Sequence, residues 1–173
     1  MERSLREKIL VWLPVLMLPA FNIILAIITG ASYDAHNAIR WAAGAVAEEL
    51  FFRGFLLKTI FLPRIKPVLA IILVSALFAA MHLINLRNGT PFHAILPQML
   101  CAFCFSMWAG AVVWRKGSIL IPLLAHVLLN ATAVTEGSLI PVLASAVVLV
   151  DGILLMKAEV DHANHSLTIM RRF

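Results

Sequence analysis

Long blocks of apolar residues alternate with short polar connections along this chain. A helix that spans a bilayer needs about 20 mostly apolar residues. The blocks that approach this length lie at residues 9–28, 41–62, 68–86, 92–114, 118–135 and 139–156. The connections between them contain Gly, Pro and Asn, which favour turns and end helices. The pattern predicts an all-α integral membrane protein with about six transmembrane helices.

Composition supports a membrane-embedded chain. Of the 173 residues, 62% are hydrophobic and only 13% are charged, whereas soluble domains carry about 25% charged residues. So little charge cannot cover a water-facing surface of this size. The same balance excludes a disordered chain, and two cysteines are too few for a disulfide-stapled scaffold. With no internal repeat visible, residues 1–173 are interpreted as one membrane-embedded domain.

The basic residues fall on alternate connections. Eleven of the 14 Lys and Arg residues lie on one side, Arg40 and Arg87 lie on the other, and Arg53 lies inside a block. The positive-inside rule then predicts an integral plasma (inner) membrane protein with both termini in the cytoplasm and a polar, frayed tail at 157–173. The first block lacks a clear cleavage site and is interpreted as a retained anchor. This distribution explains the sequence pI of about 9.8 without a nucleic-acid partner.

The second block contains three ionisable residues, Glu48, Glu49 and Arg53. Glu49 and Arg53 are four positions apart, so they share a helix face and can form an ion pair. Glu48 is turned by about 100° from Glu49 and has no local partner. One interpretation is a buried ionic cluster that fixes helix packing. This cluster gives Glu48 no partner on its own helix. Because charges inside a bilayer are costly, a functional role for Glu48 is favoured.

Further polar residues lie in two other blocks: His82 in the third, and His126 with Asn130 in the fifth. Hydrogen bonds between helices are one explanation, and haem ligation or a metal site built from His82, His126 and Glu48 are others. At about 1.5 Å of rise per residue, all four side chains fall in the outer half of the bilayer. A shared level favours a single polar site between the second, third and fifth helices.

These segments resemble the motif set of the CAAX-protease and bacteriocin-processing (CPBP or Abi) family of intramembrane endopeptidases. The family pattern is EExxxR, then FxxxH, then HxxxN or HxxxD. This chain offers Glu48-Glu49 with Arg53, Phe78 with His82, and His126 with Asn130, in that order on separate blocks. The resemblance covers residues 48–130, within a motif core at 41–135.

The resemblance implies roles for these residues. Glu48 is expected to be the general base, with His82 as its partner in activating a water molecule. His126 and Asn130 are expected to stabilise the oxyanion, while Glu49 and Arg53 support the site. It leaves open whether Glu48 or Glu49 is the base, with Glu48 preferred. A glutamate-type mechanism without metal or cofactor is favoured, and zinc held by His82, His126 and Glu48 is the alternative.

The chain departs from the eukaryotic prenyl-protein proteases of this family in two ways, because it has fewer predicted helices and a site that faces outward. A prenylated CAAX tail is therefore a doubtful substrate. We expect a membrane-associated or exported protein substrate, such as a leader or a C-terminal sorting tail, met in the lipid bilayer. The alternatives are a catalytically silent scaffold or bacteriocin-immunity protein, and a small transporter. A transporter would string polar residues across the whole bilayer, which this chain does not do.

Overall fold

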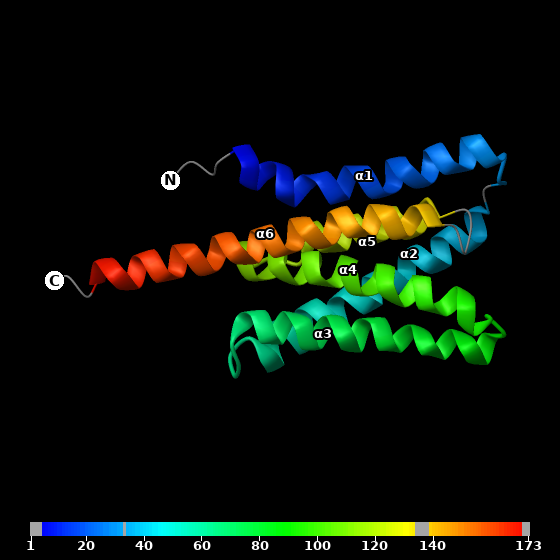
Figure 1. Cartoon of the computed structure of the whole chain (residues 1–173). Helices are drawn as coiled ribbons and strands as arrows, with labels where there is room; N and C mark the ends of the chain where they lie inside the picture. Colours follow the sequence, from blue (N-terminus) through cyan, green and yellow to red (C-terminus); the bar gives the residue numbers. More distant parts are fainter. Residues whose placement is uncertain (1–4, 33, 134–138, 171–173) are drawn as a thin grey trace.

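The computed structural model describes residues 5–32, 34–133 and 139–170, and in the last range the side chains of 144–162. This part of the chain is helical and contains no strand. The α-helices are α1 (Leu5–Thr29), α2 (Ala35–Glu49), α3 (Pro67–Met81), α4 (Phe92–Lys116), α5 (Leu120–Ala131) and α6 (Leu139–Met170). A π-helical segment, η1 (Leu50–Phe61), continues α2, and a 3₁₀ segment, η2 (His82–Asn88), continues α3. Figure 1 shows the helices side by side, with the start of α1 and the end of α6 at the same end of the bundle.

The observed helices correspond to the six predicted blocks. Within the described residues, three helical stretches are long and apolar enough to cross a membrane: Leu5–Thr29, Pro67–Asn88 and Phe92–Lys116. The helix Leu120–Ala131 is apolar but shorter. Large hydrophobic side chains such as Ile27, Ile28 and Leu120 point outward, an arrangement suited to lipid and unfavourable in water. The chain is an all-α integral membrane protein, as the hydropathy pattern predicts.

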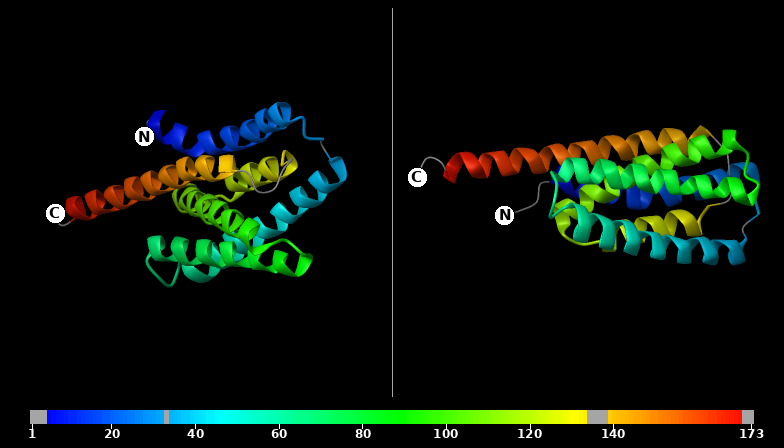
Figure 2. Two further views of the ribbon diagram at one scale, coloured as in Figure 1. Left: turned by 45° about the vertical axis from the view of Figure 1, so that its right-hand side comes forward. Right: turned by 90° about the horizontal axis from the view of Figure 1, so that it is seen from below.

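Helix α4 lies at the centre of the bundle, between α3 and α6 (Figure 2). The indole of Trp108 is fully buried and donates a 3.1 Å hydrogen bond to the Leu10 carbonyl of α1. Gly152 of α6 lies directly against the Trp108 backbone, where an added Cβ would approach its Cα to 2.8 Å. A small residue at this crossing therefore lets α4 and α6 pack closely.

The prediction of a frayed tail is wrong for residues 157–170, because α6 continues as a helix to Met170. The first turn of this extension contains Lys157, Ala158 and Glu159, which all have high helix propensity. Glu159 also accepts a hydrogen bond from Arg115 at the end of α4. Local propensity and this contact explain why the polar composition does not end the helix. Residues 171–173 lie outside the described part.

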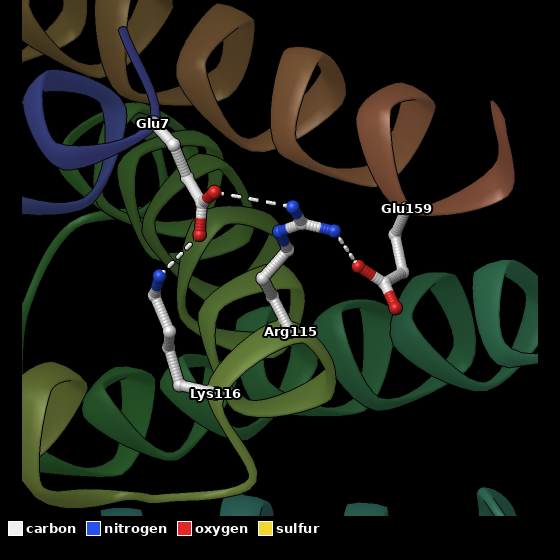
Figure 3. Close-up of polar contacts among 4 residues, drawn as sticks. All are labelled: Glu7, Arg115, Lys116 and Glu159. Atoms are coloured by element: carbon white, nitrogen blue, oxygen red, sulfur yellow. Dashed lines mark hydrogen bonds and ion pairs between the residues drawn. The ribbon is translucent and has the colours of Figure 1, made fainter. Parts of the chain in front are cut away.

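An ionic cluster joins three helices at the end of the bundle where α1 begins (Figure 3). The Glu7 carboxylate accepts hydrogen bonds from Arg115, at 3.1 Å, and from Lys116. Arg115 reaches Glu159 with its other terminal nitrogen. All four side chains are partly exposed, so each pair contributes at most about 1 kcal/mol to stability. The cluster fixes the relative position of α1, α4 and α6.

Candidate active site

A buried ion pair connects α2 to η1. Glu49 is the last residue of α2, and its Oε1 lies 2.9 Å from Nη1 of Arg53; neither side chain is exposed to solvent. The pairing predicted from their spacing is confirmed. Two charges without contact to water are costly unless each is compensated. Oε2 of Glu49 and the three guanidinium nitrogens of Arg53 have no hydrogen-bond partner among the described residues, so the pair depends on its own attraction and on the side chains around it.

Aromatic rings surround the Arg53 guanidinium. Its Cζ lies 4.4 Å from the centre of the Phe78 ring of α3 and 5.6 Å from the Phe105 ring of α4. A cation over the face of a desolvated aromatic ring is stabilised by about 2 kcal/mol. Phe78 and Phe105 therefore stabilise the Arg53 charge from two neighbouring helices.

His126 of α5 lies between the two glutamates. Its Nδ1 donates a 2.9 Å hydrogen bond to Oε1 of Glu49, and its Nε2 lies 3.8 Å from Oε2 of Glu48. The second distance is too long for a hydrogen bond but places the Glu48 carboxylate next to the ring. Glu48 is partly exposed, whereas Glu49 is fully buried. The pair of adjacent carboxylates thus occupies two different environments, with Glu49 held in place and Glu48 accessible.

His82 begins η2 and faces the same region from the end of α3. Its Nδ1 lies 3.0 Å from the Phe78 carbonyl oxygen. A carbonyl only accepts, so Nδ1 must carry the hydrogen, and the neutral ring presents an unprotonated Nε2. The Phe78 ring makes edge contacts with both His82 and His126, with centroids 5.3 and 5.8 Å apart. Phe78 therefore contacts both imidazole rings and helps to set the distance between them. The FxxxH motif alone does not predict this role.

Asn130 lies one turn beyond His126 on α5. Its Nδ2 donates a 3.1 Å hydrogen bond to the Trp41 carbonyl of α2. That bond fixes the amide and leaves the second hydrogen on Nδ2 for another acceptor.

These residues meet at a cavity of about 170 Å³. His82, His126 and Asn130 line it, and they come from two segments, η2 and successive turns of α5. Glu48 does not line the cavity. Its carboxylate lies beside His126, which does line it. Within the described residues Glu48 and His82 form no hydrogen bond with each other.

The cavity also has polar residues that the sequence pattern did not single out. Asn22 of α1 and Ser145 of α6 also line it. Each stands among apolar residues in its block, so no sequence signal connected it to the motifs.

The predicted zinc ligands do not gather as a ligand set. In the described part of the chain, no three His, Cys, Asp or Glu side chains are arranged to hold one metal ion. The Nδ1 atoms of His82 and His126 are each engaged, by a backbone carbonyl and by Glu49. These bonds leave Nε2 as the open nitrogen of each ring.

Comparison with known proteins gives one match. The family model of the type II CAAX prenyl endopeptidase Rce1-like proteins matches residues 35–132. The match spans more than half of the chain and includes α2 through α5 with every motif residue described above. No curated protein and no solved structure matches the chain.

Proposed function

The chain belongs to the Rce1-like family of type II CAAX prenyl endopeptidases, and from this premise we propose that it is an active intramembrane endopeptidase. The family as a whole cleaves peptide bonds within membranes. The observation that supports activity in this chain is the meeting of His82, His126 and Asn130 at one cavity, with the Glu48 carboxylate beside His126. Helix packing alone does not require three polar side chains around an open space.

In the proposed mechanism, Glu48 and His82 activate the attacking water. An ionised Glu48 accepts a proton from the water, and the unprotonated Nε2 of His82 holds the same water by accepting its other hydrogen. The water oxygen then forms a bond to the carbonyl carbon of the substrate. The proton held by Glu48 passes to the amide nitrogen as the C–N bond breaks, so that a carboxylic acid and an amine leave.

His126 and Asn130 would stabilise the negative oxygen formed in this step. Because the hydrogen on Nδ1 of His126 is committed to Glu49, the ring donates to an oxyanion only if Nε2 is protonated as well. The charges of Glu49 and Arg53 balance each other, which leaves Glu48 as the counter-charge to that cation. Asn130 supplies a second donor through the free hydrogen of its amide. Donors fixed in a water-poor site are worth about 10²–10³ in rate each.

We further propose that the site opens toward the outer face and acts on a membrane-associated or exported protein. The cavity takes its residues from the later turns of α1 and α5, the end of α3 and the early turns of α4 and α6. The cluster of Glu7, Arg115, Lys116 and Glu159 lies at the opposite ends of these helices, at the start of α1 and the end of α4. The excess of basic residues at that end supports a cytoplasmic location for both termini. A leader or a C-terminal sorting tail is then the substrate class, met in the lipid bilayer.

A catalytically silent scaffold or immunity protein is the second candidate. The Glu49–Arg53–His126 network favours it, because these bonds join α2, η1 and α5 and would be retained for packing alone. Glu48 separates the two proposals, since it is partly exposed and contributes no hydrogen bond to this network in the described residues.

The deciding experiment compares host cells that carry the wild-type chain, Glu48→Gln, Glu159→Gln or a deletion. Intact masses are measured for their membrane and exported proteins. We expect the deletion and Glu48→Gln to accumulate the same longer form of one protein, while the matched control Glu159→Gln processes it normally. If Glu48→Gln behaves as wild type and the deletion has a phenotype, the scaffold proposal replaces the enzyme proposal.

A further inference from the structure

The site cavity has a second wall built by helices outside the family match. The match ends at residue 132 and begins at residue 35, so it excludes α1 and α6. Six of the cavity residues come from these two helices: Leu18, Phe21, Asn22, Ala144, Ser145 and Val148. The motif residues therefore form one part of the cavity lining, and two helices outside the matched range form another.

This second wall is apolar toward the cavity. The amide nitrogen of Asn22 is already committed, because it donates to the Leu129 carbonyl at 3.0 Å and to Thr132 Oγ1 at 3.3 Å. Ser145 hydrogen-bonds Cys101 across the α4–α6 boundary. With these polar groups engaged by the protein, the surface left for an occupant consists mainly of hydrocarbon side chains.

The volume limits what can fill it. An apolar cavity of about 150 Å³ accommodates a molecule the size of benzene, and this cavity measures about 170 Å³. One Leu, Met or Phe side chain matches that space. A prenyl chain, which is several times larger than benzene, would extend beyond this volume.

We propose that this cavity binds one apolar side chain of the substrate next to the peptide bond that is cut, and that α1 and α6 set the size of that side chain. The inference rests on the proposed endopeptidase function. An occupant in contact with Leu18 and Val148 shares the cavity with His82, His126 and Asn130. Filling the cavity also excludes water other than the attacking molecule.

Two substitutions in α6 change the cavity in opposite directions. Ala144→Leu fills it, because Ala144 is a buried lining residue, and Val148→Ala enlarges it. Ala146→Leu is the matched control, since Ala146 lies on the same helix but is exposed on the outer surface. The full-length variants are produced in host cells together with Glu48→Gln.

The probe is a library of reporter proteins, each with one apolar membrane segment and randomised residues on its outer flank. New termini are identified by mass spectrometry. We expect wild-type cuts to share Leu, Met or Phe at one fixed position. Ala144→Leu should reduce those cuts about tenfold or more and favour Ala or Gly there, because one misfitting methylene in an apolar pocket has an effect of this size. Val148→Ala should admit Trp, and Ala146→Leu should match wild type.

The outcomes separate the two proposals. Cuts that depend on Glu48 but show no side-chain preference, or a preference that Ala144→Leu and Val148→Ala leave unchanged, overturn the inference alone. The absence of any Glu48-dependent cut overturns the proposed function and the inference with it. If Ala144→Leu does not accumulate in the membrane, Val148→Ala decides.

Discussion

The Nδ1 atom of His126 donates a hydrogen bond to the Glu49 carboxylate across 2.9 Å, between α5 and α2. The same carboxylate oxygen lies 2.9 Å from Nη1 of Arg53, so a single buried atom accepts a hydrogen bond from an imidazole and forms an ion pair with a guanidinium. Glu49 thereby orients the His126 ring and directs Nε2 toward Glu48. This relationship divides the two adjacent glutamates into a positioning residue and a candidate base, and it supports the preference for Glu48.

Glu49→Gln should therefore mainly lower stability, whereas Glu48→Gln should mainly lower activity. Removing the Glu49 charge leaves Arg53 buried without its partner, which costs about 3–5 kcal/mol. We expect Glu49→Gln to lower accumulation in the membrane and the apparent melting temperature in detergent. Glu48→Gln should abolish cleavage with little change in either quantity, because Glu48 is partly exposed. A stable and inactive Glu49→Gln together with an active Glu48→Gln would reverse the assignment.

Asn130→Ala should reduce the rate of cleavage by about 10²–10³, the usual effect of removing one oxyanion donor. The loss should fall on kcat more than on KM, because the proposed hydrogen bond forms as charge develops on the substrate oxygen. The bond to the Trp41 carbonyl is lost as well. An Asn37→Ala variant, which alters an exposed hydrogen bond near the start of α2, controls for a simple weakening of α2. Equal rates for Asn130→Ala and Asn37→Ala would remove Asn130 from the site.

The sequence predicts the parts of this site that depend on spacing along one helix. The Glu49–Arg53 pair and the shared face of His126 and Asn130 follow from a separation of four residues. Contacts between helices do not follow from such spacing. The enclosure of Arg53 by Phe78 and Phe105 depends on how α3 and α4 pack, and neither the Phe–His spacing nor hydropathy contains that information.

The same limit explains the error at the end of the chain. Polar composition after residue 156 indicated a frayed tail, whereas the Glu159–Arg115 contact depends on where α4 ends relative to α6. The sequence also did not predict that Asn22 and Ser145 line the cavity, because this depends on how α1 and α6 pack around it.

The orientation of the chain can be tested directly. We expect a reporter fused at Ser32, between α1 and α2, to lie on the outer side of the membrane, because the basic residues concentrate on the other side. Reporters at Lys116 and after Phe173 should both lie in the cytoplasm. The paired reporter activities of a periplasmic and a cytoplasmic enzyme at each position provide the measurement. A cytoplasmic Ser32 fusion would contradict the outward-facing site and, with it, the choice of an exported substrate.

Metal removal distinguishes the glutamate-type mechanism from the zinc alternative. We expect a chelator to leave cleavage by the purified chain unchanged, since no three His, Cys, Asp or Glu side chains of the described residues are arranged to hold one metal ion. Activity is measured before and after dialysis against the chelator, with the metal content determined on the same samples. Loss of activity that zinc restores would assign His82, His126 and Glu48 a metal-binding role.

The contact between Arg115 and Glu159 predicts a specific effect at the end of α6. Glu159→Gln removes one charge of a partly exposed pair, so the overall cost should be at most about 1 kcal/mol. The effect should be local, because Glu7 continues to hold Arg115 and Lys116 against α1. We expect faster amide exchange from residue 157 onward, while the stretch of α6 packed against Trp108 stays protected. Lys157→Gln, an exposed change in the same turn, is the control. Exchange that is equally slow in wild type and Glu159→Gln would show that helix propensity alone maintains this extension of α6.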